Sequence, residues 1–334
     1  MKRERYCILV GLFLLLSVLF GGMSFFSEIH AATPGYPEHP ITIVVPFPAG
    51  GLSDLGARII AEAMEKNLKQ AVVVANKTGG GGTIGGYAVT TAKPDGYTLG
   101  YFASQSSVPE VFSYFYQAPY SSKDLKPISK IHIPALGWTV QGDAPWNSLN
   151  DVVEFARKNP GMKVGHPGKT TVAYLSIATV ARAEKVEFVN VPYEGDAKIV
   201  PAILGGHIPV GVLGFPAIRS LFDSKKVKVL ALCLEQRADF APEIPTVAEL
   251  YKSVKFTALH GMGLFAPKGT PDEVVKRIDE VIHKITEEQD FRSKSKGISL
   301  PIVYENTASF EKSIIRYKEE MQVFLKEEGL VKAK

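Results

Sequence analysis

The stretch ITIVVPFPAGGLSDLGARIIAEAM, residues 41–64, decides the fold. Its β-branched start predicts a buried strand, and two prolines end that strand because proline donates no ladder hydrogen bond. Gly50 and Gly51 allow a tight turn, and Ser53 and Asp54 are suited to begin a helix with apolar residues at helical spacing. Such a strand, turn and helix start point backbone N–H groups and a helix dipole at an anion. The stretch is equally compatible with an ordinary strand-to-helix connection that binds no ligand, so the rest of the sequence must distinguish between the two interpretations.

The composition is that of a soluble globular protein with enough residues for two cores. The chain has 334 residues, of which 46% are hydrophobic and 22% are charged. A net charge of +4, without a basic stripe that carries interleaved aromatics, argues against a nucleic-acid partner. The chain contains no P-loop, no nucleophile elbow and no histidine pair at metal spacing. We therefore expect no catalytic residues, no metal and no cofactor.

Residues 1–32 have the pattern of a secretory signal peptide. A positive start, MKRER, precedes an apolar stretch at 8–20 and a small-residue cleavage site at 30–32. The apolar character continues to residue 26, so an uncleaved membrane anchor is the alternative. Cys7 lies inside this segment, which leaves Cys233 as the single thiol of the mature chain. We expect secretion into the periplasm after the signal is cleaved.

Predicted strands and helices alternate in two sets. In the first set, strands at 71–75 and 97–103 and a short helix at 87–92 follow the opening stretch, a pattern typical of a parallel sheet. The second set comprises helix 149–158, strand 162–165, helix 172–184, strand 187–191, helix 197–204, strand 208–213, helix 217–224 and strand 228–234.

Between the two sets we expect a turn-rich segment at 120–131 and one extended run at 131–140. Near the C-terminus we expect a long helix capped by Thr270 and a last helix at 308–328. Two sets predict an α/β protein with two lobes, 33–135 with 236–334 and 136–235. Two crossing strands would form the hinge between them.

The glycine-rich loop at 79–86 supports an alternative function. It matches G-x-G-x-x-G after a strand, the fingerprint of an NAD(P)-dependent α/β oxidoreductase. However, the acidic residue expected about 20 positions later is missing, because Asp95 comes too early and lies in a turn. A tight turn without a ligand is a second explanation. We favour a third, in which the backbone amides of this loop line an anion pocket.

Candidate binding residues lie in loops that follow strands, because ligands of open α/β sheets bind at that edge. In the first set these loops are 46–54, 78–85 and 104–107, and they supply Ser53, Thr78, Gly82, Ser104 and Gln105. In the second set the candidates are His166, Gly168, Lys169, Thr170, Tyr193, Asp196 and Phe215. Lys169 would serve as a point-charge partner for a carboxylate or be a solvated loop lysine.

The chain resembles the extracytoplasmic solute receptors of tripartite tricarboxylate transporters, the Bug or TctC-like family. The resemblance rests on YPEHPITIVVPFPAGGLSDLGAR and on later blocks in the family's order, including AVVVANKTGGGGTIGG, KPDGYTLGYF, FVNVPYEGDA and GLFAPKGTPDEVVKRI. It implies a two-lobed periplasmic binding protein fold of type II-like architecture, with a small organic carboxylate held in the cleft between the lobes. The residues that match the family's binding loops are Phe47, Ala49, Gly50, Gly51 and Asp54 in the first loop and Thr83 in the second.

Three departures from the family pattern concern the half of the cleft that would recognise the solute. GHPGKTT replaces a Ser/Gly-rich loop, Ala173-Tyr174 replaces a histidine, and LHGM replaces a tryptophan. The resemblance implies a receptor that closes on a carboxylated solute and delivers it to membrane permease subunits. We expect this receptor to be a monomer. A ligand-sensing receptor for a signalling partner is the other alternative. Backbone N–H groups and helix dipoles, rather than a buried arginine, would bind the carboxylate.

Overall fold

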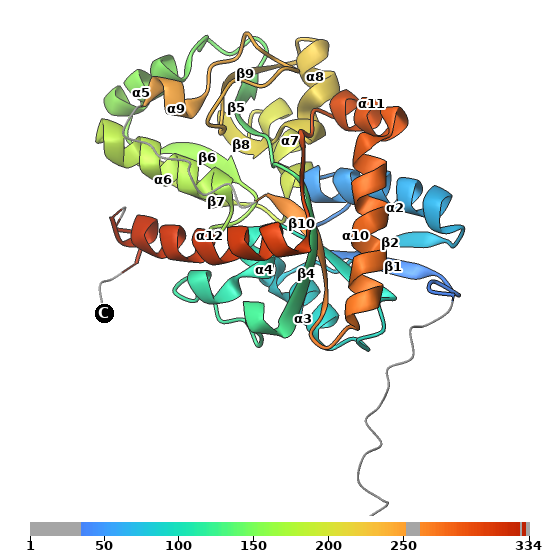
Figure 1. Ribbon diagram of the computed structural model, residues 1–334. Coiled ribbons are helices and arrows are strands. Elements are labelled where there is room, and N and C mark those ends of the chain that lie inside the picture. Colours follow the sequence, from blue (N-terminus) through green and yellow to red (C-terminus); the bar gives the residue numbers. More distant parts are fainter. Residues whose placement is uncertain (1–34, 252–260, 328, 332–334) are drawn as a thin grey trace, which may run out of the picture. The chain divides into compact units, whose positions relative to one another are not determined.

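The computed structural model describes residues 35–251, 261–327 and 329–331. The signal peptide expected at 1–32 and the first residues of the LHGM stretch lie outside these ranges. Residues 37–334 form one unit that contains two β-sheets flanked by helices, as Figure 1 shows. The predicted fold class is thus confirmed.

The first sheet has six strands in the order β11-β4-β10-β3-β1-β2. Their bounds are β1 (Ile41–Val45), β2 (Val72–Asn76), β3 (Thr98–Phe102), β4 (Leu125–His132), β10 (Met262–Pro267) and β11 (Ile302–Glu305). Strand β1 pairs in parallel with β2 and β3, as the alternating pattern predicts, whereas β10 lies antiparallel between β3 and β4. The helices that belong to this part are α2 (Leu52–Leu68), α3 (Thr83–Thr90), α4 (Ser104–Ser107), α10 (Asp272–Glu287), α11 (Gln289–Gly297) and α12 (Thr307–Glu327).

The second sheet has five strands in the order β7-β6-β8-β5-β9. Their bounds are β5 (Leu136–Gln141), β6 (Met162–His166), β7 (Phe188–Pro192), β8 (Val210–Gly214) and β9 (Val227–Leu232). Strand β6 is parallel to β7 and β8, and β5 is antiparallel to β8 and β9. The helices of this part are α5 (Leu149–Lys158), α6 (Val172–Glu184), α7 (Asp196–Leu204), α8 (Arg219–Asp223) and α9 (Val247–Leu250).

Each sheet has its own apolar core. Trp138 of β5 is fully buried in the second sheet, and its indole N–H donates to Ser176 Oγ at 2.9 Å. In the first sheet, Phe265 stacks against Phe102 and packs on Phe310 of α12. Leu175 of α6 is buried in this same first-sheet cluster. The two sheet-bearing parts therefore share apolar contacts.

Strand β4 corrects the expectation of a turn-rich segment at 120–131. The sequence of this strand contains two lysines and Pro127, which are unusual in a buried strand. In the structure, Lys130 is buried and pairs with Glu305 at 2.9 Å. Helix α10 also lies against β4 (Figure 1). The extended run expected at 131–140 is interrupted between β4 and β5, where Pro134 lies and the chain passes from one sheet to the other.

Smaller corrections concern the helices. Helix α10 begins at Asp272 after Pro271, and Thr270 does not cap it because its hydroxyl donates to Pro267 O at 2.8 Å. Helix α3 begins at Thr83, four residues before the expected start. Helix α11 and strand β11 were not predicted.

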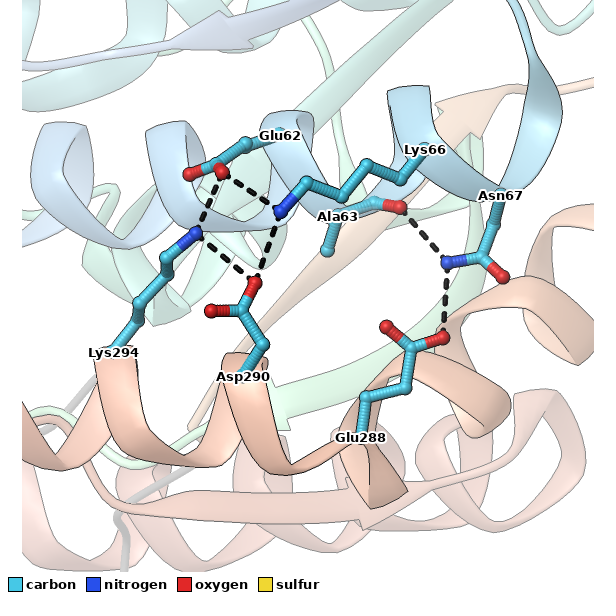
Figure 2. A network of polar contacts seen from close by, with 7 residues as sticks. All are labelled: Glu62, Ala63, Lys66, Asn67, Glu288, Asp290 and Lys294. Atoms are coloured by element: carbon cyan, nitrogen blue, oxygen red, sulfur yellow. Dashed lines mark hydrogen bonds and ion pairs between the residues drawn. The ribbon is translucent and has the colours of Figure 1, made fainter.

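Helix α11 is joined to α2 by a polar network, which Figure 2 shows. At its centre are four charged side chains, those of Glu62, Lys66, Asp290 and Lys294. Each lysine contacts both acids, at distances from 2.6 to 3.1 Å. Asn67 adds a hydrogen bond to Glu288. Because these side chains are largely exposed, the network orients the two helices more than it stabilises the fold.

Candidate functional site

Asp54, in the first turn of α2, organises the loop between β1 and α2. Its carboxylate accepts hydrogen bonds from Gly50 N–H, from Asn76 Nδ2 and from two nitrogens of Arg58, all at 2.9 Å. Asn76 also donates to Phe47 O, which fixes the opposite side of the loop. Burial raises the pKa of Asp54, but the hydrogen bonds from Arg58, Gly50 and Asn76 outweigh burial and hold that pKa below its usual value. Asp54 therefore shapes the loop as an ionised carboxylate.

Backbone geometry explains the glycines of the loop at 79–86. Gly79, Gly80, Gly81 and Gly82 all have positive φ, between 58° and 114°. A Cβ at Gly86 would lie 1.8 Å from the hydroxyl of Tyr120. Both the turn and the close approach of an aromatic ring thus require glycine, whether or not the loop contacts a ligand.

A cavity of about 60 Å³ lies where residues of both sheet-bearing parts meet. It is lined by Phe47, Pro48, Gly51, Leu52, Ser53, Ala103, Gln105, Pro134, Leu136, Pro167, Thr171, Val172, Gly195, Asp196, Gly261 and Met262. Three helices begin at this cavity, since Leu52, Val172 and Asp196 are the first residues of α2, α6 and α7. Their N-termini bring to one place N–H groups that have no partner within their own helix, and the positive ends of three helix dipoles.

Five predicted candidates line the cavity: Phe47, Gly51, Ser53, Gln105 and Asp196. Most of the lining residues that sequence reasoning missed are apolar or contribute backbone, and these types carry no chemical signal. Five of them lie inside the predicted loops, beside the chosen candidates: Pro48, Leu52, Pro167, Thr171 and Gly195. Pro134 and Leu136 come from a segment where no binding loop was expected. Gly261 and Met262 end the LHGM stretch, which the family resemblance had placed at the cleft.

The other candidates from the first set lie outside the lining of the cavity. They are Ala49, Gly50, Asp54, Thr78, Gly82 and Thr83. The side chain of the further candidate Ser104 lies outside the described part of the structure. Ala49, Gly50 and Thr78 are exposed, whereas Thr83 is buried and its hydroxyl donates to Gly80 O at 2.9 Å. Their role in binding stays a prediction.

The remaining candidates from the second set are His166, Gly168, Lys169, Thr170, Tyr193 and Phe215. His166 is fully buried at the end of β6, and its Nδ1 accepts a hydrogen bond from Gly168 N–H at 3.1 Å. Burial lowers the pKa of His166 to about 4, so the ring is neutral near pH 7. Lys169 is exposed, and Phe215 is fully buried among the aromatic side chains of the second sheet.

Asp196 connects the N-terminus of α7 to that of α2. Its Oδ2 accepts a hydrogen bond from Leu52 N–H at 3.1 Å, and its Oδ1 accepts one from Gly214 N–H at 3.0 Å. The residue is 8% exposed. Burial raises the pKa of Asp196, and the two backbone hydrogen bonds only partly oppose this shift. The Asp196 carboxylate thus accepts a hydrogen bond from an N–H group at the start of α2, as expected for an anion at a helix N-terminus.

Two further contacts join the sheet-bearing parts. The hydroxyl of Tyr116 donates to Thr170 Oγ1 at 3.2 Å, and the rings of Phe115 and Tyr174 meet edge to face with their centroids 6.0 Å apart. Together with the Leu52–Asp196 hydrogen bond, they hold the two parts in direct contact around the cavity.

Within the described ranges, no three acidic, histidine or cysteine side chains gather where they could hold a metal ion. In the same part of the chain, no helix combines the length and the apolar character needed to cross a bilayer.

Known proteins are similar to this chain in sequence or in structure. A Pseudomonas sp. protein described as "UPF0065 protein in tcbD-tcbE intergenic region" is 34% identical over 252 residues, which are 75% of this chain and 74% of that protein. The periplasmic binding protein BugD has a TM-score of 0.79 and 28% identity, and the similarity covers 89% of this chain and all of BugD. MatC from Rhodopseudomonas palustris, solved with bound malate, shares the fold at a TM-score of 0.76 and 23% identity, over 87% of this chain and 100% of MatC.

The profile of the tripartite tricarboxylate transporter family receptor, TctC, matches residues 56–330. This match replaces the oxidoreductase alternative, because proteins of this family and fold are solute-binding proteins and not enzymes. Since it spans most of the sequence, the chain belongs to the TctC family of transporter receptors and is a solute receptor with the periplasmic binding protein fold.

Proposed function

We propose that this receptor binds a small organic carboxylate in the cavity where α2, α6 and α7 begin, and delivers it to the membrane permease subunits of a tripartite tricarboxylate-type transporter. The observation that carries the proposal is the convergence of these three helix N-termini on one cavity. The family's description supports the transporter partner.

Backbone donors suffice for useful affinity. Among the described residues that line the cavity, none is lysine, arginine or histidine, so a solute carboxylate would rest on N–H groups, on the hydroxyls of Ser53 and Thr171 and on the amide of Gln105. A hydrogen bond to a charged group contributes roughly 1.5–3 kcal/mol. Three or four such bonds, with burial of the solute, reach the roughly 8 kcal/mol of micromolar binding after the cost of association.

The test is calorimetry on residues 33–334 with malate, citrate and butyrate, and with malate diamide as the uncharged control. We expect at least one carboxylate to bind with a micromolar dissociation constant and the diamide not to bind. If no carboxylate binds, or if the diamide binds as tightly, the proposal is wrong.

A paired substitution locates the site. A Cβ at Gly51 would lie 3.4 Å from Asp196 Oδ2, so Gly51→Val places its methyl groups at the cavity wall. A Cβ at Gly297 meets no atom within 4 Å, and Gly297→Val is the matched control. We expect Gly51→Val to abolish carboxylate binding and Gly297→Val to preserve it.

We also propose that residues 1–32 direct export to the periplasm and are then removed. The exported chain would be a monomer with lobes at 33–135 with 236–334 and at 136–235. The mass and N-terminal sequence of the exported protein, and light scattering of the purified chain, test the cleavage and the monomer.

A further inference from the structure

Asp196 is the only charged side chain among the described residues that line the cavity. Its two hydrogen-bond partners are the backbone N–H groups of Leu52 and Gly214, and no cation contributes to its electrostatic environment. The residue is more than nine-tenths buried. The cavity therefore contains one uncompensated acidic group.

The position of this group decides what else the cavity can accept. Leu52 N–H is the first amide of α2, and Asp196 already uses it. A second solute carboxylate that reaches the N-terminus of α2 therefore meets the Asp196 carboxylate nearby. At a separation of about 6 Å and an effective dielectric constant of about 20, a pair of like charges lowers affinity by roughly 100-fold.

The rest of the wall offers no compensation for a second or third solute charge. Most of the wall is apolar side chain, namely Phe47, Pro48, Leu52, Ala103, Pro134, Leu136, Pro167, Val172 and Met262. The polar side chains other than Asp196 are neutral: Ser53, Gln105 and Thr171. A solute that has a single carboxylate, bound at the helix N-termini away from Asp196, and a short, uncharged body fits this wall.

We propose that Asp196 is the specificity-determining residue of this receptor and restricts it to small solutes with one ionised carboxylate, against dicarboxylates and tricarboxylates. The proposal rests on the proposed function, because it assigns the charge class of the solute bound at the same site.

The test uses succinate and succinamate, which have the same chain length and differ by one charge, because one carboxylate of succinate is an amide in succinamate. Calorimetry at pH 7 measures both dissociation constants for the wild type, for Asp196→Asn and for Asp143→Asn. Asp143 is exposed and lies outside the cavity lining, so its variant removes the same charge from elsewhere. Tricarballylate is the probe with three charges.

For the wild type and Asp143→Asn we expect succinamate to bind at least tenfold more tightly than succinate, and tricarballylate to bind more weakly still. Asp196→Asn should raise the affinity for succinate by about 100-fold and remove the preference. Equal wild-type affinities for succinate and succinamate overturn the proposal, even if Asp196→Asn fails to fold. An unchanged preference in folded Asp196→Asn overturns it as well. Tighter binding of succinate than of succinamate to the wild type also overturns it, because the second solute carboxylate would then take the place of Asp196. If no carboxylate of any charge binds, the proposed function fails instead.

Discussion

Replacing Asp54 by alanine tests whether the loop between β1 and α2 depends on one buried carboxylate. Asp54 is 2% exposed and accepts four hydrogen bonds, from Gly50, Asn76 and, twice, Arg58. The side chain of Arg58 is 52% exposed, so its pairing with Asp54 is screened by water and contributes at most about 1 kcal/mol. The bonds from Gly50 and Asn76 to the charged carboxylate contribute roughly 1.5 kcal/mol or more each, with some compensation by water at exposed Gly50.

These contributions predict that Asp54→Ala lowers the free energy of unfolding by about 3 kcal/mol at pH 7. For a chain of this size, that loss corresponds to a melting temperature lower by roughly 5–10 °C. The control is Arg58→Ala, which removes the guanidinium and leaves the carboxylate bound to Gly50 and Asn76. We expect it to cost no more than about 1 kcal/mol. Urea titrations of the three proteins give the comparison.

The pH dependence of the same experiment identifies the ionised carboxylate. Because the pKa of Asp54 is lower in the folded chain than in the unfolded chain, its contribution is complete above the unfolded value of about 3.9 and is lost as the pH falls through the folded value. The difference between wild type and Asp54→Ala should be constant from pH 8 to pH 5 and shrink below about pH 4. A difference that stays constant to pH 2, or an equal loss in Arg58→Ala, would refute the reasoning.

Three further predictions address other parts of the chain. Burial lowers the pKa of His166 to about 4 and that of His132 to about 3. As the pH drops below about 6.5, these histidines are protonated in the unfolded chain but still neutral in the folded chain, so the free energy of unfolding should fall. Urea titrations at pH 7 and pH 5 measure this fall, which should be smaller in His166→Gln. Gly86→Ala should lower the free energy of unfolding by about 1–3 kcal/mol, because the added Cβ overlaps the Tyr120 hydroxyl. Gly297→Ala has open space around its Cβ and should unfold at a higher temperature than Gly86→Ala. Lys66→Ala should lower the melting temperature slightly at 10 mM NaCl but not at 1 M NaCl, because the exposed network of Figure 2 is screened by salt, and an equal effect at both concentrations would contradict this.

Elements with strong local signals were predictable from the sequence. Helix α5 has the predicted bounds, because Ser148 and Asp151 form a capping box and the apolar positions repeat at helical spacing. Helix α6 also begins and ends as predicted. The turn between β1 and α2 was predicted from its prolines and glycines.

Elements that depend on distant partners were not predictable. Lys130 gives β4 a polar appearance, yet its charge is paired with Glu305, 175 residues further along the chain. Helix α11 has a polar sequence in which only Phe291 and Ser295 are buried, and its contacts with α2 come from the network around Lys66 and Lys294. A propensity for strand or helix is weak in such segments, and tertiary contacts decide the structure.

The candidate site shows the same division. The sequence predicted that binding residues lie in loops at strand ends. Five of these candidates do line one cavity: Phe47, Gly51, Ser53, Gln105 and Asp196. The partner of Asp196 was not predictable, because Leu52 lies 144 residues away and contributes only a backbone N–H group. Apolar wall residues such as Met262 and Leu136 give no chemical signal in a sequence.

Asp54 and Asp196 show how two carboxylates near one helix N-terminus acquire different roles. Asp54 lies inside the first turn of α2 and has Arg58 beside it, so its pKa is lowered and its charge is a fixed part of the loop. Asp196 comes from α7 and has only backbone donors, so burial raises its pKa. Changing Asp54 should therefore alter stability and weaken binding of every solute together. Changing Asp196 should alter the preference between solutes of different charge, because that carboxylate alone adds charge to the cavity wall.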